Sequence, residues 1–442
     1  MAQTPQEILD ASPMSTLQIV AVGICVLLNA VDGFDVLAIS FASPGIAAEW
    51  GIERAALGIV LSMELIGMAV GSVVIGPIAD RYGRRPLILG CLIVMTLGMF
   101  ATAQANHVVE LSVYRLLTGL GIGGMLAVIN AMTAEYSNVR YRPTAVIIMA
   151  SGYPLGAVLG GMVVADLLVA FDWRIVFVFG GVVTLACIPL VFWLLPESVG
   201  FLAGRKQTSD KMRASTLNQI NQLLARMGHA AADRLPDLVP RTAVAELFSP
   251  ILRRATLLLT VAYFFHIMTF YFILKWIPKL VADMGYAPAE AGGVLVWANL
   301  GGLAGCVVIG ALSAKFNVKT LILVLLIGAV GMVSYFGQGH SDLAGLALTA
   351  AIAGFFTNGV IVGLYALFAQ IFDTNVRATG TGFVIGSGRG GSALGPVIAG
   401  FMFTLSFGLD SVAIIMALGS AVAFIAILSL RVNTPFKTPA PH

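Results

Sequence analysis

The segment Gly76-Pro-Ile-Ala-Asp80-Arg81-Tyr-Gly83-Arg84-Arg85 joins two apolar runs, residues 55–77 and 86–104. Each run is long enough to cross roughly 30 Å of hydrocarbon as a helix that rises about 1.5 Å per residue. The connection between them is short and basic, which is typical of a loop on the cytoplasmic side of a membrane. We therefore predict that this stretch is a membrane-spanning helical hairpin.

Ten further apolar runs lie outside this hairpin, in two groups separated by a polar, basic stretch. The twelve runs fall near residues 17–41, 55–77, 86–104, 111–135, 143–168, 173–195, 253–281, 289–313, 318–337, 342–370, 378–406 and 409–430. They predict an all-α membrane protein with twelve transmembrane helices in two six-helix bundles. We expect an N-terminal tail at 1–16, bundles at 17–195 and 251–431, a loop at 196–250 and a C-terminal tail at 432–442.

The composition excludes several other classes of protein. Of the 442 residues, 58% are hydrophobic and 11% are charged, whereas soluble chains carry about 25% charged residues. There is no ten-residue alternation typical of an outer-membrane barrel, and the polar N-terminus lacks the pattern of a cleaved signal peptide. Catalytic, P-loop and dinucleotide motifs are missing, so we predict no enzyme, cofactor or nucleic-acid partner. The four cysteines fall in four different runs and suggest neither disulfides nor a metal site.

The basic residues predict the orientation. With a cytoplasmic N-terminus, nineteen of the 25 Lys and Arg residues lie in cytoplasmic segments, the stretch 196–254 included. Arg54, Arg174, Lys275 and Lys279 fall on or near the opposite side, and two arginines lie inside spans. The positive-inside rule therefore predicts that both termini are cytoplasmic in a bacterial inner membrane. We expect the loop to be partly helical, with its basic stretch 211–226 near anionic headgroups.

The two groups of runs share short repeats. Gly71-Ser-Val-Val-Ile-Gly76 recurs as Gly305-Cys-Val-Val-Ile-Gly310, and Asn138-Val-Arg140 recurs as Asn375-Val-Arg377. These pairs lie at corresponding spans that face the same way across the membrane. They indicate a parallel six-plus-six duplication, which places a substrate site between the halves near the midplane.

Ionisable residues inside spans are candidates for function, because each costs roughly 2.5–3.5 kcal/mol at the membrane centre. The ionisable candidates are Asp32, Asp35, Glu64, Arg115, Glu135, His266 and Arg389, and their polar companions are Tyr153, Asn299 and Asn358. Spans three, six, nine and twelve carry no such charge, and we expect them to face lipid.

Asp32 and Asp35 are three residues apart, which places both carboxylates on one helix face. Two carboxylates this close oppose each other's ionisation, which suits groups that take up and release a proton. We assign proton coupling to both and to Glu64, with Gly33 allowing close approach of another backbone. The alternative is that the two aspartates form a structural salt bridge with Arg115.

Arg389 lies in Gly386-Ser-Gly-Arg-Gly-Gly391, where small neighbours leave its guanidinium room to bind a carboxylate. An interhelical bridge is the alternative. His266 suits a core position and a proton relay equally, and for Glu135 we expect a structural salt bridge beside the Arg140 loop. The aromatic residues over 263–272 suit a planar substrate, although packing explains such clusters more often.

The opening segment resembles the loop signature of the major facilitator superfamily. The resemblance implies a conformational lock between the halves, at the positions Gly76, Asp80, Arg81, Gly83, Arg84 and Arg85. Asp32-Gly-Phe-Asp35 is similar to the first-span element of the aromatic acid:proton symporters, as are Arg115, Leu195-Pro-Glu-Ser198, Arg377-Ala-Thr-Gly380 and Arg389 at their positions. This second resemblance implies that the two aspartates couple transport to protons and that the arginines bind the carboxylate of the substrate.

Our hypothesis is proton-coupled import of an organic, aromatic carboxylate by a monomer that alternates its access. Arg389, helped by Arg115, holds the carboxylate, and Tyr153, His266, Asn299 and Asn358 contribute to the pocket. Import of an aliphatic dicarboxylate such as muconate stays open, because the second arginine could bind a second carboxylate. Proton-coupled export also stays open, because Gly152-Tyr-Pro-Leu-Gly-Ala-Val-Leu-Gly-Gly161 partly resembles a motif of drug:proton antiporters.

Overall fold

The computed structural model describes residues 3–205, 210–236, 244–313, 315–339, 342–372 and 374–430, and these ranges contain helices and no strands. The helices are α1 (Pro5–Ala11), α2 (Thr16–Trp50), α3 (Arg54–Tyr82), α4 (Arg84–Ala103), α5 (Val108–Tyr136), α6 (Arg142–Ala170), α7 (Arg174–Leu194), α8 (Val199–Gly204), α9 (Asp210–Arg226), the 3₁₀ helix η1 (Val244–Phe248), α10 (Arg253–Asp283), α11 (Pro288–Leu312), α12 (Val318–Phe336), α13 (Leu343–Ile371), α14 (Thr374–Thr404) and α15 (Leu409–Leu428).

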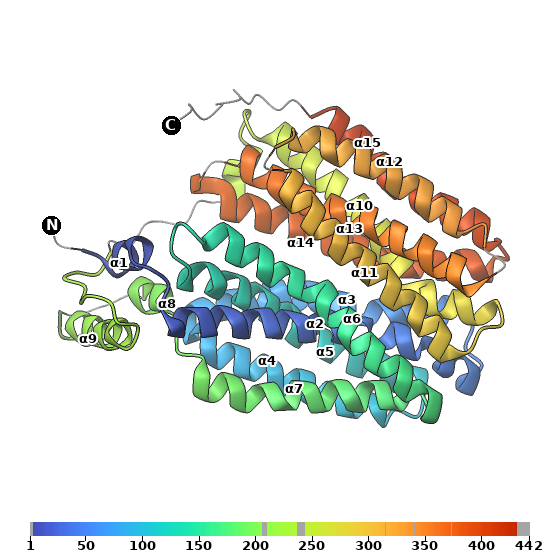
Figure 1. The fold of residues 1–442 in the computed structure, drawn as a ribbon, viewed down its shortest axis with the longest axis horizontal. Helices are drawn as coiled ribbons and strands as arrows, with labels where there is room; N and C mark the ends of the chain where they lie inside the picture. The colour runs from blue at the N-terminus through green and yellow to red at the C-terminus, as the bar shows by residue number, and fades with distance from the viewer. Residues whose placement is uncertain are drawn as a thin grey trace.

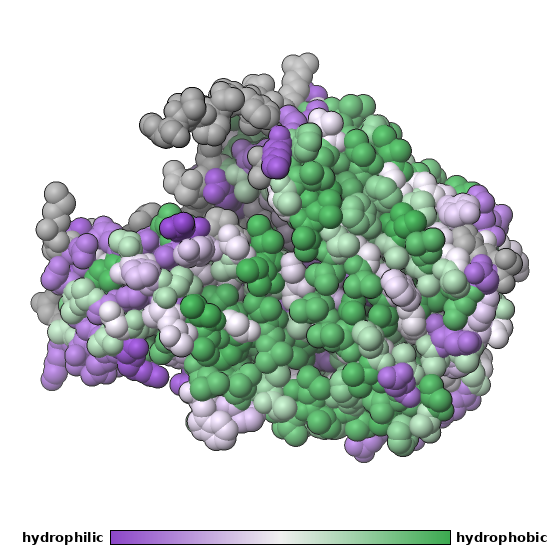
Figure 2. All heavy atoms as spheres, in the orientation of Figure 1, coloured by the Kyte–Doolittle hydropathy of each residue, from purple (hydrophilic) through white to green (hydrophobic). Residues whose placement is uncertain are grey.

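The twelve long helices form two bundles, α2–α7 and α10–α15, which lie side by side in Figure 1. The predicted all-α membrane fold with twelve spans in two bundles is therefore confirmed. Eleven of the long helices are apolar enough to cross a membrane by composition, and α14 is long enough but contains many glycines and Arg389. Figure 2 shows hydrophobic residues over the middle of the visible face and hydrophilic ones gathered at both ends.

Two helices are longer than the sequence predicted. α2 continues nine residues past the expected end at 41, because Pro44 is accommodated inside it and the helix ends only at Gly51, with φ of 58°. α3 continues through most of the opening segment to Tyr82, so that Gly83 alone connects it to α4. Gly83 has φ of 113°, a conformation that residues with a side chain rarely adopt. The segment is thus a helix end with a one-residue turn, and not a loop.

Glycines allow α2 and α6 to pack closely. A Cβ atom on Gly33 would lie 2.0 Å from the backbone oxygen of Tyr153, and one on Gly156 would lie 1.8 Å from that of Ala30. Such distances are far inside van der Waals contact, and a backbone oxygen cannot rotate away. The predicted close approach of a second backbone at Gly33 is therefore confirmed.

We expect Gly33→Ala to destabilise the protein by about 1–3 kcal/mol, because the added methyl group forces α2 and α6 apart. The control is Gly23→Ala on the same helix, where a Cβ atom would meet no atom within 4 Å. Thermal unfolding of the two purified variants in detergent checks this prediction. Equal melting temperatures would contradict it.

The 196–250 segment is partly helical, as expected, and contacts the beginning of the chain. The backbone N–H of Gln3 donates to Asp233 (2.9 Å), and Nε2 of His229 lies 2.9 Å from Oε1 of Gln18. Burial lowers the pKa of His229 below its ordinary value, which favours the neutral ring in this contact. α1, α8 and α9 lie together at one end of the molecule (Figure 1), called here the α9 end.

The two bundles are joined mainly through α3 with α14, α6 with α11, and α2 with α10 and α11. The hydrogen bonds between described residues of the two bundles lie toward the end opposite α9. Arg54 pairs with Asp283 (3.0 Å), and the N–H of Ala55 donates to Thr404 (3.0 Å). The described hydrogen bonds between the bundles therefore close the end opposite α9.

Candidate functional site

Two carboxylates without cationic partners lie in the middle of α2. Asp32 and Asp35 are 1% and 0% exposed. Neither oxygen of Asp32 has a hydrogen-bond partner among the described residues, and Asp35 accepts one hydrogen bond, from Thr184 (3.2 Å). An ionised carboxylate is costly in such surroundings unless it is paired, so these positions favour a group that binds a proton.

Arg115 of α5 pairs with Glu64 of α3, and both side chains are fully buried. Its other contacts are with the backbone oxygen of Asp35 (2.8 Å), the sulfur of Met99 (3.1 Å) and the ring of Phe177, 5.4 Å away. The alternative salt bridge between Arg115 and the carboxylates of Asp32 and Asp35 is not formed, because the guanidinium of Arg115 pairs with Glu64 instead. Arg115 therefore supports the backbone of α2 beside Asp35.

Lys275 is a buried cation that the sequence analysis placed on or near the opposite side of the membrane. It lies eight residues before the end of α10, in the half of the helix away from α9, and the sequence analysis missed that its side chain is inside the span and 0% exposed. Its ammonium group lies 3.4 Å from Oε2 of Glu64 and donates to the backbone oxygen of Val36. The signal was present in the sequence, since a lysine inside the run 253–281 is as costly as the arginines that we singled out.

Arg389 occupies the middle of α14, and its guanidinium forms no hydrogen bond or ion pair with any residue that the structure describes. It interacts electrostatically with Asp32 of the other bundle. Four tyrosines from three helices lie near it, namely Tyr153, Tyr263, Tyr271 and Tyr365. This side chain is thus a cation without a protein anion in contact, surrounded by phenol groups from both bundles.

The tyrosines around Arg389 are partly organised by one another. Tyr263 and Tyr365 stack with ring centroids 6.1 Å apart and share a hydrogen bond between their hydroxyls (3.2 Å). The buried hydroxyl of Tyr153 lies beside that of Tyr271 but forms no well-aligned hydrogen bond with a described residue. The sequence analysis singled out Tyr153 and the cluster at 263–272 but missed Tyr365, a polar aromatic residue six residues before the end of α13.

Three other predicted pocket residues have partners within their own bundle. Nε2 of His266 donates to the backbone oxygen of Thr357 (2.9 Å), and its Nδ1 lies 3.0 Å from the Ser420 hydroxyl. Asn299 and Asn358 donate to backbone oxygens of their own helices, at 2.9 and 3.2 Å. The contacts of His266 favour a role in packing α10 against α13 and α15.

The arginines of the opening segment contact residues of their own bundle. Arg84 pairs with Glu135 (3.4 Å), and Arg85 donates to the backbone oxygen of Phe192. Arg81 lies over the ring of its neighbour Tyr82. The contacts of Gly76 and of the Asp80 side chain, which the resemblance assigns to the conformational lock, lie outside what the structure describes. The structural salt bridge expected for Glu135 is present, and its partner is Arg84 at the beginning of α4.

Glu197 caps the beginning of α4. Its Oε1 accepts from the backbone N–H groups of Arg84 (2.9 Å) and Ser198 (2.8 Å), and the hydroxyl of Ser198 donates to Glu135. Burial raises the pKa of Glu197, and the hydrogen bonds from these N–H groups oppose that shift. A carboxylate at a helix N-terminus is also favoured by the helix dipole. The Leu195-Pro-Glu-Ser198 stretch therefore ties the end of α7 to α3, α4 and α5.

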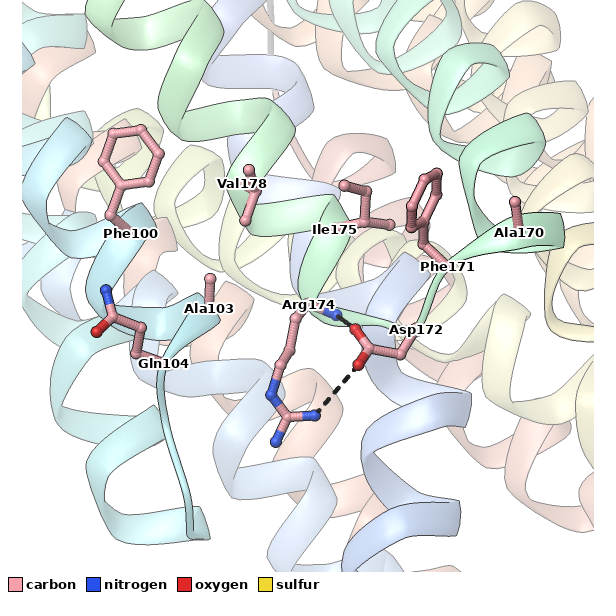
Figure 3. Close-up of a pocket in the computed structure, with 9 residues that line it drawn as sticks. All are labelled: Phe100, Ala103, Gln104, Ala170, Phe171, Asp172, Arg174, Ile175 and Val178. Atoms are coloured by element: carbon pink, nitrogen blue, oxygen red, sulfur yellow. Dashed lines mark hydrogen bonds and ion pairs between the residues drawn. The ribbon is translucent and has the colours of Figure 1, made fainter.

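A surface hollow of about 560 Å³ lies elsewhere, beside the connection of α6 and α7. Figure 3 shows Arg174 and Asp172 on one side of it and Phe100 and Gln104 on the other. It contains none of the buried charged residues. We therefore place the candidate site at Asp32, Asp35, Tyr153 and Arg389, between the bundles.

Comparisons with known proteins agree with this architecture. The family model described as Major Facilitator Superfamily matches residues 25–339 and again 259–442. A gallate transporter of Pseudomonas putida is 33% identical over 95% of this chain and 93% of its own length. A 4-hydroxybenzoate transporter of the same organism is 31% identical over 96% and 94%. A 3-(3-hydroxy-phenyl)propionate transporter of Escherichia coli K12 is 33% identical over 95% of each chain.

The fold is similar to that of a solved sugar transporter. The xylose transporter of E. coli, in a partially occluded inward-open conformation, superimposes with a TM-score of 0.76 at 16% identity, over 97% of this chain and 100% of that one.

Proposed function

The chain belongs to the Major Facilitator Superfamily of membrane transporters, and from this premise we propose that it imports an aromatic carboxylate together with a proton. Relatives with about 31–33% identity transport gallate, 4-hydroxybenzoate and 3-(3-hydroxy-phenyl)propionate. The observation that carries the proposal is Arg389, a guanidinium among tyrosines with no anionic partner in contact. A carboxylate is the ligand that its fork fits best.

The phenol groups suit the rest of an aromatic acid. Tyr263 and Tyr365 provide flat faces for a ring, and the hydroxyl of Tyr153 can bond to a polar substituent. Arg115 is held by Glu64, so we assign it to supporting α2 and leave the carboxylate to Arg389. The binding set that we propose is Arg389 and Tyr153 with Tyr263, Tyr271 and Tyr365.

The proton binds at Asp32 and Asp35. Asp32 is close enough to interact electrostatically with Arg389, so a carboxylate bound there would repel an ionised Asp32. Protonation of Asp32 removes this repulsion, and release of the proton restores it. Binding of the acid and of the proton therefore support each other. Glu64, which the sequence analysis grouped with the aspartates, has a cation at each oxygen, and we assign it to the ion pairs with Arg115 and Lys275.

With the α9 end in the cytoplasm, as the positive charges predict, the described contacts correspond to a conformation closed to the periplasm. The proton and substrate would enter at the opposite end after Arg54 and Asp283 separate, and would leave at the α9 end. The proton gradient supplies about 1.4 kcal/mol per pH unit for one proton. That is sufficient to accumulate the acid about tenfold per pH unit.

Uptake of labelled benzoate, hydroxybenzoates, gallate and muconate by cells with and without the protein tests the proposal. We expect accumulation of at least one aromatic acid, and its loss when an uncoupler collapses the proton gradient. Accumulation of muconate alone would favour the dicarboxylate alternative. Lower labelling of the expressing cells would favour export and would end the import assignment.

A further inference from the structure

Lys275 has polar partners only in the other bundle, within the part of the chain that the structure describes. It belongs to α10, whereas Glu64 and Val36 belong to α3 and α2. The ammonium group is fully buried, and the neighbouring Trp276 and Leu274 are buried too. A residue needed only to fill this space would be apolar, because a buried cation is costly without partners. The lysine is therefore placed to join the two bundles.

Glu64 is shared between the bundles. One of its oxygens pairs with Arg115 in its own bundle, and the other lies 3.4 Å from Lys275. The site then contains three carboxylates, Asp32, Asp35 and Glu64, and three cations, Arg115, Lys275 and Arg389. Loss of the Lys275 charge would leave the acids in excess beside the place where an anion has to bind.

The contact lies on the side that must open. Lys275 lies eight residues before the end of α10, and Glu64 lies ten residues after the beginning of α3. Both helix ends face away from α9, next to the more exposed pair Arg54 and Asp283. If this end separates to admit a substrate, Lys275 must leave Glu64 and Val36, and water must replace them.

We propose that Lys275 is the positioning residue that closes the substrate entrance, by linking Glu64 and the α2 backbone to the other bundle once in each transport cycle. The contact holds the backbone next to Asp35 and so connects the closed entrance to the segment that binds the proton. The identity of the substrate that passes the entrance rests on the proposed function, but the contact of Lys275 with Glu64 and Val36 does not. Exposed ion pairs contribute little, so the buried contact and not the Arg54 pair dominates closure.

Distances between spin labels at the entrance test this inference. The labels replace Glu53 at the beginning of α3 and Leu405 just after α14, both of which are exposed. The two labels flank the hydrogen bond between Ala55 and Thr404. The four native cysteines, all of which are buried, are replaced by alanine so that only the introduced positions carry a label. Pulsed electron paramagnetic resonance then measures the populations of short and long distances in the purified protein, without any substrate.

We expect Lys275→Met to raise the ratio of long to short distances by about fivefold or more, the range of ordinary coupling between sites. Lys275→Gln can still donate to Val36 but lacks the charge, so it should shift the ratio of distances in the same direction. This variant replaces Lys275→Met in the experiment if the methionine variant does not fold. Lys275→Arg should restore the short distance. Lys279→Met is the matched control, because this lysine lies one turn further along α10 and pairs with Asp283 of its own helix.

Unchanged distances in Lys275→Met and Lys275→Gln would overturn the inference, as would an equal shift in Lys279→Met. Transport kinetics provide a second measurement. A carrier whose entrance stays open should show a lower maximal rate with an unchanged or lower KM for external substrate, whereas damage to the binding site would raise KM. A chain that carries none of the acids tested would refute the proposed function and leave the distance result valid.

Discussion

Replacing Arg389 with glutamine is expected to abolish binding of the carboxylate. A guanidinium that holds a carboxylate by two charge-assisted hydrogen bonds contributes about 3 kcal/mol or more. Its loss should weaken binding by about a hundredfold or more. The effect should be this large because no other cation among the described residues is free of an anion and in reach of the tyrosines.

Equilibrium binding of a labelled substrate to the purified variant measures this effect directly, and uptake by cells measures its consequence. Arg389→Lys keeps the positive charge but not the planar guanidinium that can form two parallel hydrogen bonds, so we expect this variant to recover part of the binding affinity. Arg254→Gln is the control, because that arginine is exposed and contacts the backbone oxygen of Ser429. Undiminished binding by Arg389→Gln would remove the central argument for the substrate class.

Replacing Asp35 with asparagine is expected to abolish accumulation of the substrate against its gradient. Asn cannot bind and release a proton, and it keeps the size and the contact with Thr184. Without the proton the protein can still equilibrate the substrate across the membrane. We therefore expect exchange of labelled for unlabelled substrate to continue, while concentration inside the cell falls to the level outside.

Vesicles with an imposed pH gradient separate these two activities. The unsubstituted protein should concentrate the acid about tenfold per pH unit if one proton accompanies one monoanion, and the variant should not concentrate it. Asp166→Asn on α6 is the control, because Asp166 is exposed at the protein surface. Gradient-driven accumulation by Asp35→Asn would exclude this aspartate from proton coupling, and Asp32→Asn would then be the next variant.

The fold followed from the length and composition of the apolar runs, because the bilayer leaves few alternatives to spanning helices. The resemblance to the aromatic acid:proton symporters, drawn from Asp32-Gly-Phe-Asp35 and the arginines, is confirmed by the relatives. The limits of the domains, the orientation of the termini and the roles of the site residues stay predictions. The helix ends were less predictable. Pro44 lies inside α2, although a proline often ends a helix in a soluble protein.

The pairing of the buried charges could not be predicted from one chain. Arg115, Glu64 and Lys275 come from three helices whose relative rotation depends on packing across the whole molecule. The burial of Lys275 was missed because the residue was counted with the charges that orient the protein, and not with those inside spans. His266 was ambiguous for a related reason, since its partners Thr357 and Ser420 are on distant segments.

The composition of α14 has a consequence for the synthesis of the protein. Over the residues that the structure describes, α14 is not among the helices apolar enough to cross a membrane by composition, whereas its neighbours α13 and α15 have mean hydropathies of 1.8 and 2.5. An arginine at the centre of a span costs roughly 2.5–3.5 kcal/mol during insertion, so α14 depends on these neighbours to enter the bilayer. The residue that we propose to bind the substrate thus makes its own helix costly to insert, and we expect correct assembly of the second bundle to depend on α15.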